Sequence, residues 1–164
     1  MAKITDIHCI RTRANGTWSI VKVLTDQPGL YGIGSASDYY QGVAVATVIE
    51  QSLAPALLGR DASQIEDIWQ TTYASSYWRN GSILNTALAA IDVALWDIKG
   101  KEAGLPIYQL LGGACRAAVP CYAHAGGTDL AELADDVARY AEEGYRVIRC
   151  QLGPYGGGGF LPPE

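Results

Sequence analysis

Residues 118–153 show the pattern of a strand, a helix and a second strand, and this pattern constrains the fold more than any other feature of the sequence. "AVPCYAHAGG" (118–127) is a short apolar segment that ends in small residues, "TDLAELADDVARYAEEG" (128–144) is an amphipathic helix, and "YRVIRCQLG" (145–153) is a second strand. Two strands joined in this way are expected to be parallel, with a right-handed crossover. Because parallel sheets are covered on both faces, one such unit cannot bury its own sheet. The pattern therefore indicates the first repeat of a larger α/β domain.

The N-terminal part has a different character. Turn signals occur at Asn15-Gly16 and Pro28-Gly29, where glycine supplies the positive φ that tight turns need. They separate three segments with the composition of strands, at 3–12, 18–26 and 30–37. The sequence predicts that these segments form an antiparallel three-stranded meander.

A helical block follows the meander. Apolar residues at three- and four-residue spacings predict helices over 42–59 and 82–104, and the second of these is apolar nearly all round and ends at Gly104. A third helix, within 61–78, is expected to begin with a capping box formed by Ser63 and Glu66. On the helix 82–104, Asp97 can pair with Lys101, and Asp92 is expected to have a buried hydrogen-bonding or ion-pairing role. A short helical turn over 106–113 ends the block, so that residues 1–113 form one domain and residues 114–164 begin another.

Composition excludes several classes of function. The net charge is −5 and no basic run occurs, which argues against nucleic acid and anionic membrane surfaces as partners. Apolar stretches are interrupted by charges well before the roughly 18 residues that a membrane span needs. The start of the chain lacks the apolar core of a secretory signal, so we expect a cytoplasmic protein. The four cysteines form no Cys-x-x-Cys pair, which does not favour a zinc site.

Specific segments carry a resemblance to a known family. "NTALAAIDVALWDIKGKEAGLPIYQLLGG" (85–113) resembles the helix and turn that join cap to barrel in mandelate racemase/muconate lactonizing enzyme-like members of the enolase superfamily. "GRDASQIEDIWQ", "YWRNG", "CYAHAGG" and "GYRVIRCQ" resemble its mannonate dehydratase-like branch. The resemblance implies an α+β capping domain, made of the three-stranded meander and a helical bundle. The first βαβ part of a (β/α) TIM-type barrel would follow, and the chain would be an N-terminal fragment.

The resemblance also implies a chemistry. Such enzymes remove the proton α to a carboxylate and stabilise the enediolate with Mg²⁺, and in this branch the β-hydroxyl of a sugar acid is then lost. The implied substrate is a small-molecule sugar acid of the mannonate or gluconate type, the implied assembly is a homo-oligomer, and the Mg²⁺ ligands are expected downstream of residue 164. The alternative is a non-catalytic enolase-fold protein with a binding or regulatory role.

The candidate catalytic residues are Arg149 and Tyr155. Arg149 is expected at the C-terminal end of its strand, where barrel enzymes place their sites, and it matches the "YRxxRxQ" pattern of the branch. In that pattern the arginine partners a tyrosine of the following loop. Tyr155 is the tyrosine present in this segment, and the alternative is a tyrosine that lies after residue 164. A guanidinium beside a phenol favours the phenolate, which is the form that can accept a proton. The alternative for Arg149 is a surface charge at a strand end.

The candidate substrate-binding residues come from three segments. His124 is expected to end the first barrel strand and to contact a substrate hydroxyl or carboxylate. The loop "SASDYYQG" (35–42) and the segment "YWRNG" (77–81) supply the remaining candidates, which are Asp38, Tyr39, Tyr40, Trp78 and Arg79. The alternative for His124 is a structural group with its hydrogen bonds satisfied. Plain turn formation is the alternative for 35–42, and packing at a helix start is the alternative for 77–81.

A first prediction concerns residues 1–164 expressed alone. We expect this polypeptide to convert no sugar acid, because the implied metal ligands and most of the implied barrel lie outside it. The measurement is formation of a keto-acid product from a panel of sugar acids, with the full-length parent protein as the positive control. Turnover by the purified 164-residue polypeptide would contradict both the fragment interpretation and the placement of the metal ligands.

Overall fold

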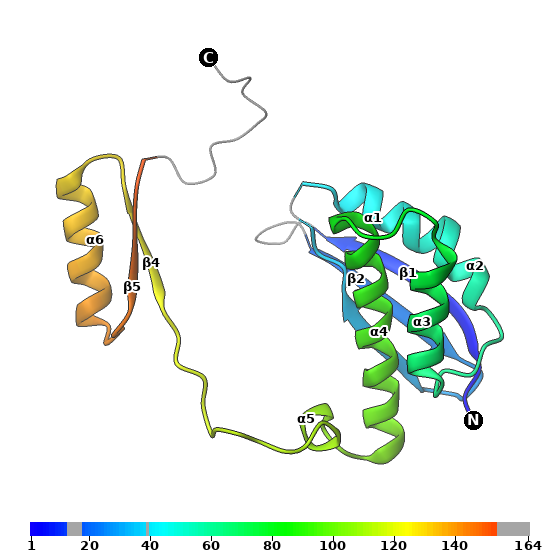
Figure 1. Ribbon diagram of the computed structural model, residues 1–164. Helices are drawn as coiled ribbons and strands as arrows, with labels where there is room; N and C mark the ends of the chain where they lie inside the picture. The colour runs from blue at the N-terminus through cyan, green and yellow to red at the C-terminus, as the bar shows by residue number, and fades with distance from the viewer. Residues whose placement is uncertain (13–17, 39, 154–164) are drawn as a thin grey trace. The chain divides into compact units, whose positions relative to one another are not determined.

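The computed structural model describes residues 1–12, 18–38 and 40–153 of the 164-residue chain (Figure 1). The chain forms two compact units, Met1–Ala114 and Cys115–Glu164. Each unit is described by itself below.

The first unit is built on a three-stranded antiparallel sheet. Its strands are β1 (Ile4–Thr12), β2 (Trp18–Thr25) and β3 (Tyr31–Ser35), in the spatial order β1-β2-β3. Ile7 lies opposite Val23 in the first pair of strands, and Ile20 lies opposite Ser35 in the second. The predicted antiparallel meander is therefore confirmed.

The helical block follows the sheet. The predicted helix 42–59 is instead three consecutive segments: α1 (Gly42–Val48), the π-helical turn η1 (Ile49–Leu53) and α2 (Ala54–Leu57). Pro55 lies in the first turn of α2 directly after the π-helical turn, and it has no N–H to bond to the preceding turn. The block continues with α3 (Ile65–Ser75), α4 (Ser82–Ala103) and the short α5 (Ile107–Leu110).

The start of α3 differs from the prediction. The expected capping box is wrong, because Gln64 is the N-cap and makes no side-chain cap hydrogen bond. The backbone N–H of Ser63 donates instead to Oδ1 of Asp61 at 2.9 Å, and Glu66 accepts from the side-chain amide of Gln70 at 2.8 Å. Ser63 N–H is therefore bonded within a local turn formed by Asp61, and not to the side chain of Glu66 as in a capping box.

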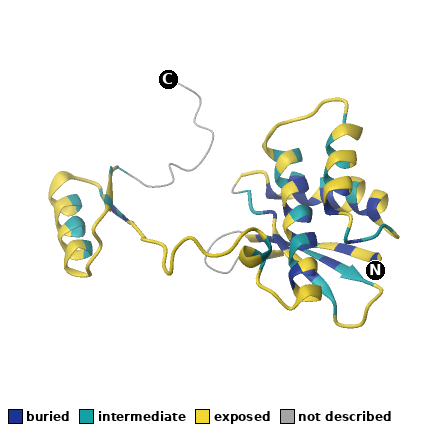
Figure 2. Ribbon diagram, turned by 60° about the horizontal axis from the view of Figure 1, so that its bottom comes forward, coloured by how far each residue is buried: buried dark blue, intermediate teal, exposed yellow. Residues whose placement is uncertain are grey.

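Helix α4 supplies much of the core of the first unit. It runs along the sheet and ends at Gly104, which adopts the left-handed conformation at φ 64°, as the sequence predicts. Its buried residues meet the buried side chains of β2 and of the other helices (Figure 2). The buried apolar residues of α4 are Ala87, Leu88, Ala90, Ile91, Ala94, Leu95 and Ile98.

Strand β3 and helix α4 are in backbone contact. A Cβ atom added to Gly32 would lie 1.8 Å from the carbonyl oxygen of Ala94, and one added to Gly34 would lie 1.9 Å from that of Ala90. Both distances are far below any van der Waals contact. The strand can therefore lie this close to the helix only because these two positions carry no side chain.

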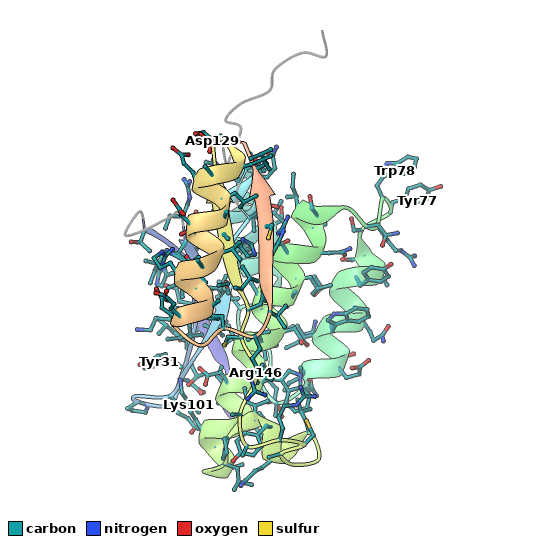
Figure 3. All side chains as sticks on the ribbon, turned by 90° about the vertical axis from the view of Figure 1, so that its left-hand side faces the viewer. Tyr31, Tyr77, Trp78, Lys101, Asp129 and Arg146 are labelled. Carbon is teal, nitrogen blue, oxygen red and sulfur yellow. The ribbon has the colours of Figure 1, made fainter. Side chains whose placement is uncertain are left out.

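Two charged residues of α4 bind the outer edge of β3. Oδ2 of Asp97 accepts from the backbone N–H of Ile33 at 2.9 Å, and Nζ of Lys101 donates to the carbonyl oxygen of Tyr31 at 2.7 Å. The two side chains also form an ion pair at 2.7 Å, as the sequence predicts, and Figure 3 shows Lys101 beside Tyr31. These bonds occupy backbone groups at the edge of the sheet that would otherwise be open to another chain.

Asp92 is a partly buried carboxyl residue of α4. Among the described residues it forms neither a hydrogen bond nor an ion pair. The expected pairing was between the capping domain and the barrel, most of which lies outside this chain, so that role stays a prediction. Partial burial of its carboxyl, together with the nearby charge of Glu66, raises the pKa of Asp92 above its ordinary value.

The second unit is one strand–helix–strand repeat. Strands β4 (Ala123–Gly127) and β5 (Ile148–Leu152) are parallel, and α6 (Leu130–Glu142) connects them, which confirms the predicted arrangement. The first strand is shorter than the predicted segment 118–127. Asp129 caps α6 by accepting from the backbone N–H groups of Ala131 and Glu132 at 2.8 and 2.9 Å. Figure 3 shows Asp129 at this end of the helix.

A second prediction tests the contact between β3 and α4. Gly34→Ala is expected to lower the free energy of unfolding by about 3 kcal/mol or more, because the new methyl group meets a backbone carbonyl that cannot turn away. Gly42→Ala is the matched control, since its added Cβ would lie 3.4 Å from Oγ of Ser19 and alanine is favoured in a helix. Chemical denaturation of the two variants and the parent gives the comparison. Equal effects at the two positions would show that the close contact is absent.

Candidate functional site

The centre of the candidate site is a pair of residues on neighbouring strands of the second unit. His124 of β4 lies directly opposite Arg149 of β5 in the parallel register. Side chains that lie opposite each other in this way point to the same face of a sheet, and the strands are about 4.8 Å apart. The fold therefore brings together two of the residues singled out by the sequence.

The face that carries this pair is the one away from α6. Side chains alternate between the faces of a strand, and the residues on either side of His124 are Ala123 and Ala125, of which Ala125 is only 1% exposed. The helix packs on this alanine face of β4. Small alanines allow the helix to approach, whereas His124 and Arg149 lie on the opposite face, which no helix or strand among residues 115–153 covers.

His124 and Arg149 lie nearer to the start of their strands than expected. Both residues were expected at the C-terminal end of a strand. Each is instead the second of five strand residues, and pairing continues to Gly127 and Leu152. The cause is that both strands begin later than the predicted segments 118–127 and 145–153, at Ala123 and Ile148, and end near the predicted limits.

Two of the predicted residues lie outside the described part of the chain. These are Tyr155, the candidate partner of Arg149, and Tyr39, a candidate substrate contact. Their roles stay predictions.

In the first unit, Asp38 has a local structural role. Its Oδ1 accepts from the backbone N–H groups of Tyr40 at 3.0 Å and of Gln41 at 2.6 Å, which shapes the turn that enters α1. Tyr40 is 70% exposed. The loop thus has a defined backbone conformation around an exposed aromatic side chain.

The segment that joins α3 to α4 presents two aromatic rings to solvent. Tyr77 and Trp78 are 86% and 81% exposed, and their rings meet edge to face with centroids 5.2 Å apart (Figure 3). Asn80, with φ 81°, and Gly81, with φ 92°, take successive positive φ values at the base of this segment. Asn80 also accepts from the hydroxyl of Tyr73 at 3.2 Å. The exposed rings are therefore held on a turn of restricted conformation.

Arg79 is directed differently from its aromatic neighbours. Its guanidinium lies over the ring of Tyr73, 5.7 Å from the centroid. It also lines a groove of about 390 Å³ between the helices of the first unit, together with Arg60 and apolar residues such as Leu57 and Leu88. Arg79 is exposed and contacts Tyr73 and the groove of its own unit, and its role in substrate binding stays a prediction.

The two loops of the first unit lie at the same end of that unit. Gly34 meets Ala90, whereas Gly32 meets Ala94, so β3 runs antiparallel to α4. The end of β3, which leads to Asp38, therefore lies near the beginning of α4, which follows Trp78 (Figure 1). The sequence separated these candidates by about forty positions, and the fold brings their loops to one end.

The described residues contain neither a cluster of metal ligands nor a helix suited to span a membrane. No group of three or more His, Cys, Asp or Glu residues there is placed to hold a metal ion. None of the helices in residues 1–12, 18–38 and 40–153 combines the length and apolar character required to cross a bilayer.

A further residue near the pair was missed by sequence reasoning. Asp136 of α6 accepts a hydrogen bond from the backbone of β4 at Gly126. The sequence did contain a signal, because Asp136 directly precedes Val137 and so places a carboxylate beside the apolar stripe of the helix. Such a position requires a polar partner on the sheet.

Comparison with known proteins gives the family. Residues 5–112 match the family model of the mandelate racemase/muconate lactonizing enzyme N-terminal domain. A D-galactonate dehydratase family member of Paenibacillus sp. is 72% identical over 161 residues, which are 98% of this chain and 40% of the relative. A D-mannonate dehydratase of Rhizorhabdus wittichii is 50% identical over 92% of this chain and 37% of its own length.

Solved structures agree with these relatives. The crystal structure of an enolase from Pantoea ananatis with bound D-gluconate and Mg superposes with a TM-score of 0.90 and 48% identity, over 98% of this chain and 39% of that one. The chain thus spans about 40% of the length of the relatives it matches. Its three-stranded sheet with helices, followed by a parallel strand pair, corresponds to the N-terminal part of these proteins. The chain belongs to the mandelate racemase/muconate lactonizing enzyme family of the enolase superfamily.

Proposed function

We propose that this chain is the N-terminal part of a Mg²⁺-dependent sugar-acid dehydratase, a lyase that acts on a substrate of the mannonate or gluconate type. The observation that carries the proposal is the register pair His124 and Arg149 on the face away from α6. The relatives support it, since one is named a D-galactonate dehydratase family member and another a D-mannonate dehydratase, and the similar enolase from Pantoea ananatis has bound D-gluconate and Mg. We further propose a cytoplasmic homo-oligomer that binds neither nucleic acid nor membrane.

The proposed reaction has two steps. A base removes the proton α to the carboxylate, which leaves an enediolate. The C–O bond of the β-hydroxyl then breaks, and this oxygen leaves as water after it gains a proton. The enol that forms becomes a keto acid, so that the reaction removes one molecule of water and needs no oxidant or reductant.

The residues of this chain would contribute to proton removal and substrate binding. The Arg149 guanidinium favours the anionic form of a neighbouring phenol, for which Tyr155 is the candidate, so that the phenolate can take the α-proton. His124, on the same face, would bind a substrate hydroxyl or carboxylate. The loops at Asp38 and Trp78 are candidates for covering the substrate from the cap.

The metal is a separate matter. Mg²⁺ would supply positive charge against the enediolate oxygens. The described residues of this chain do not form a ligand set that fits it, and its ligands are proposed to lie in the part of the protein after residue 164.

A non-catalytic family member is the alternative. It would keep the fold and the core, but it would have no need for an arginine opposite a histidine on the face away from the helix. The two candidates differ in one observable property, which is proton exchange at the α-carbon of a bound sugar acid.

A third prediction follows for the full-length protein. Arg149→Met is expected to lower kcat by about 10²–10⁴-fold, because a positioned acid–base pair contributes about this much to proton transfer. Exchange of the substrate α-proton in deuterated water should fall in parallel. Arg149→Lys should rescue poorly, since the compact ammonium lacks the planar fork of a guanidinium.

Arg146→Met is the matched control for this experiment. Arg146 is an exposed arginine that precedes β5 by two residues (Figure 3), and its loss should leave kcat unchanged. If Arg149→Met keeps its exchange rate and only raises KM, Arg149 is a substrate clamp and the proposed base pairing is wrong. If the parent itself neither exchanges nor converts any sugar acid, the dehydratase proposal fails.

A further inference from the structure

The strand that carries His124 has two edges with different partners. In β4 the backbone groups of odd-numbered residues point toward β5, because Ala123 N–H donates to the carbonyl oxygen of Val147 at 3.2 Å and the Gly127 carbonyl accepts from Gly153 N–H at 2.9 Å. Backbone groups alternate in direction along a strand. The N–H of Gly126 therefore points to the outer edge, away from β5.

Asp136 of α6 occupies this outer edge. Its Oδ2 accepts from Gly126 N–H at 3.0 Å, which ties the helix to the strand two residues after His124. The bond comes from a side chain rather than from a strand, and among the described residues it satisfies Gly126 N–H. The hydrogen bond from Gly126, followed by those from Arg139, also lowers the pKa of Asp136 below its ordinary value.

The carboxylate of Asp136 is itself held in place. Arg139, one turn further along α6, donates from Nε to Oδ1 at 3.0 Å and approaches the same oxygen with its second terminal nitrogen. Arg139 also donates to Glu143 at 2.8 Å and lies over the ring of Tyr140 at 3.9 Å. With Oδ1 occupied by the guanidinium, Oδ2 is directed to the strand.

The turn between β4 and α6 is closely packed as well. A Cβ atom on Gly127 would lie 2.5 Å from the backbone nitrogen of Leu133, so the first turn of the helix rests on the strand backbone. Thr128 donates to Oε2 of Glu132 from both its N–H and its hydroxyl, at 2.8 and 2.6 Å. The end of β4 thus has a packed turn on one side and the Asp136 bond on its outer edge.

We propose that Asp136 is a positioning residue for His124: by holding Gly126, it fixes the end of β4 so that the imidazole stays opposite Arg149. The role of His124 in substrate binding rests on the function proposed above. Asp136 itself is on the helix side of the sheet and touches no reacting atom in this account.

The experiment compares three variants of the full-length protein. Asp136→Ala removes the acceptor, Asp136→Asn keeps a side-chain oxygen for Gly126, and Asp135→Ala removes the neighbouring carboxylate of α6 as the matched control. Amide hydrogen exchange of the peptide that covers Gly126 reports on the strand, and steady-state kinetics with D-gluconate and D-mannonate, normalised to active sites, report on the site.

Asp136→Ala is expected to speed exchange at this peptide by up to about tenfold, the size of one lost hydrogen bond. It should lower kcat/KM per active site by about 10–100-fold, as loss of an orienting partner does. Asp136→Asn should stay within about threefold of the parent in both measurements, and Asp135→Ala should match the parent. A purely structural role would reduce the active fraction without changing KM or kcat per site.

Several outcomes would overturn the proposal. Unchanged exchange in Asp136→Ala would show that the bond does not fix the strand. Faster exchange with unaltered kinetics per site, or an asparagine variant no better than alanine, would show that the bond does not position His124.

If Asp136→Ala fails to fold, Arg139→Met releases the carboxylate from its clamp and should give a smaller change in the same direction, whereas no change would count against the proposal. If the parent converts no sugar acid, the proposed function fails, and the exchange measurement still decides whether Asp136 holds the strand.

Discussion

The backbone contact between β3 and α4 sets the arrangement of the first unit. Gly32 and Gly34 leave no room for a methyl group between strand and helix, and Asp97 and Lys101 bond the strand edge from the same helix. This fixes the direction of α4 along the sheet and the distance between the two layers. The buried alanines of α4 follow from this distance, since larger side chains would separate the layers again.

The contact between β3 and α4 also determines where the loop at Asp38 and the segment at Trp78 lie. Because β3 runs antiparallel to α4, the loop at Asp38 and the segment at Trp78 emerge at one end of the unit. Their contents differ in character. Asp38 organises its own turn, Arg79 rests on Tyr73, and Trp78 remains exposed on a turn with two successive positive φ values. The ring of Trp78 is thus largely exposed to solvent.

The second unit shows how a helix can organise a strand pair from behind. Ala123 and Ala125 admit the helix on one face, and the other face carries His124 and Arg149. The helix also reaches the strand edge through Asp136. Within this short strand, the small alanines contact the helix, His124 lies on the opposite face, and Gly126 bonds to Asp136 at the edge.

Much of this arrangement could be predicted from the sequence, and the failures have physical causes. The meander, the end of α4 at Gly104 and the parallel strand pair depend on turn residues and periodicity, which are local signals. The capping box at Ser63 failed because Asp61 competed for the same N–H. The bond of Asp97 to the strand backbone was not foreseen because it joins residues far apart in the sequence. The bond of Asp136 was missed although its place beside Val137 in the apolar stripe was a signal. The strand positions of His124 and Arg149 were misjudged because β4 and β5 begin later, at Ala123 and Ile148, than the segments 118–127 and 145–153 that predicted them.

The central claim is that His124 and Arg149 face one substrate. The most direct measurement is a crystal structure of the full-length protein with bound D-gluconate. The account predicts that polar atoms of the sugar acid, or of the tyrosine that meets it, lie within hydrogen-bonding distance, about 2.7–3.2 Å, of both the His124 imidazole and the Arg149 guanidinium. A sugar acid bound with only one of the two side chains in reach, or at a different face of the sheet, would contradict it.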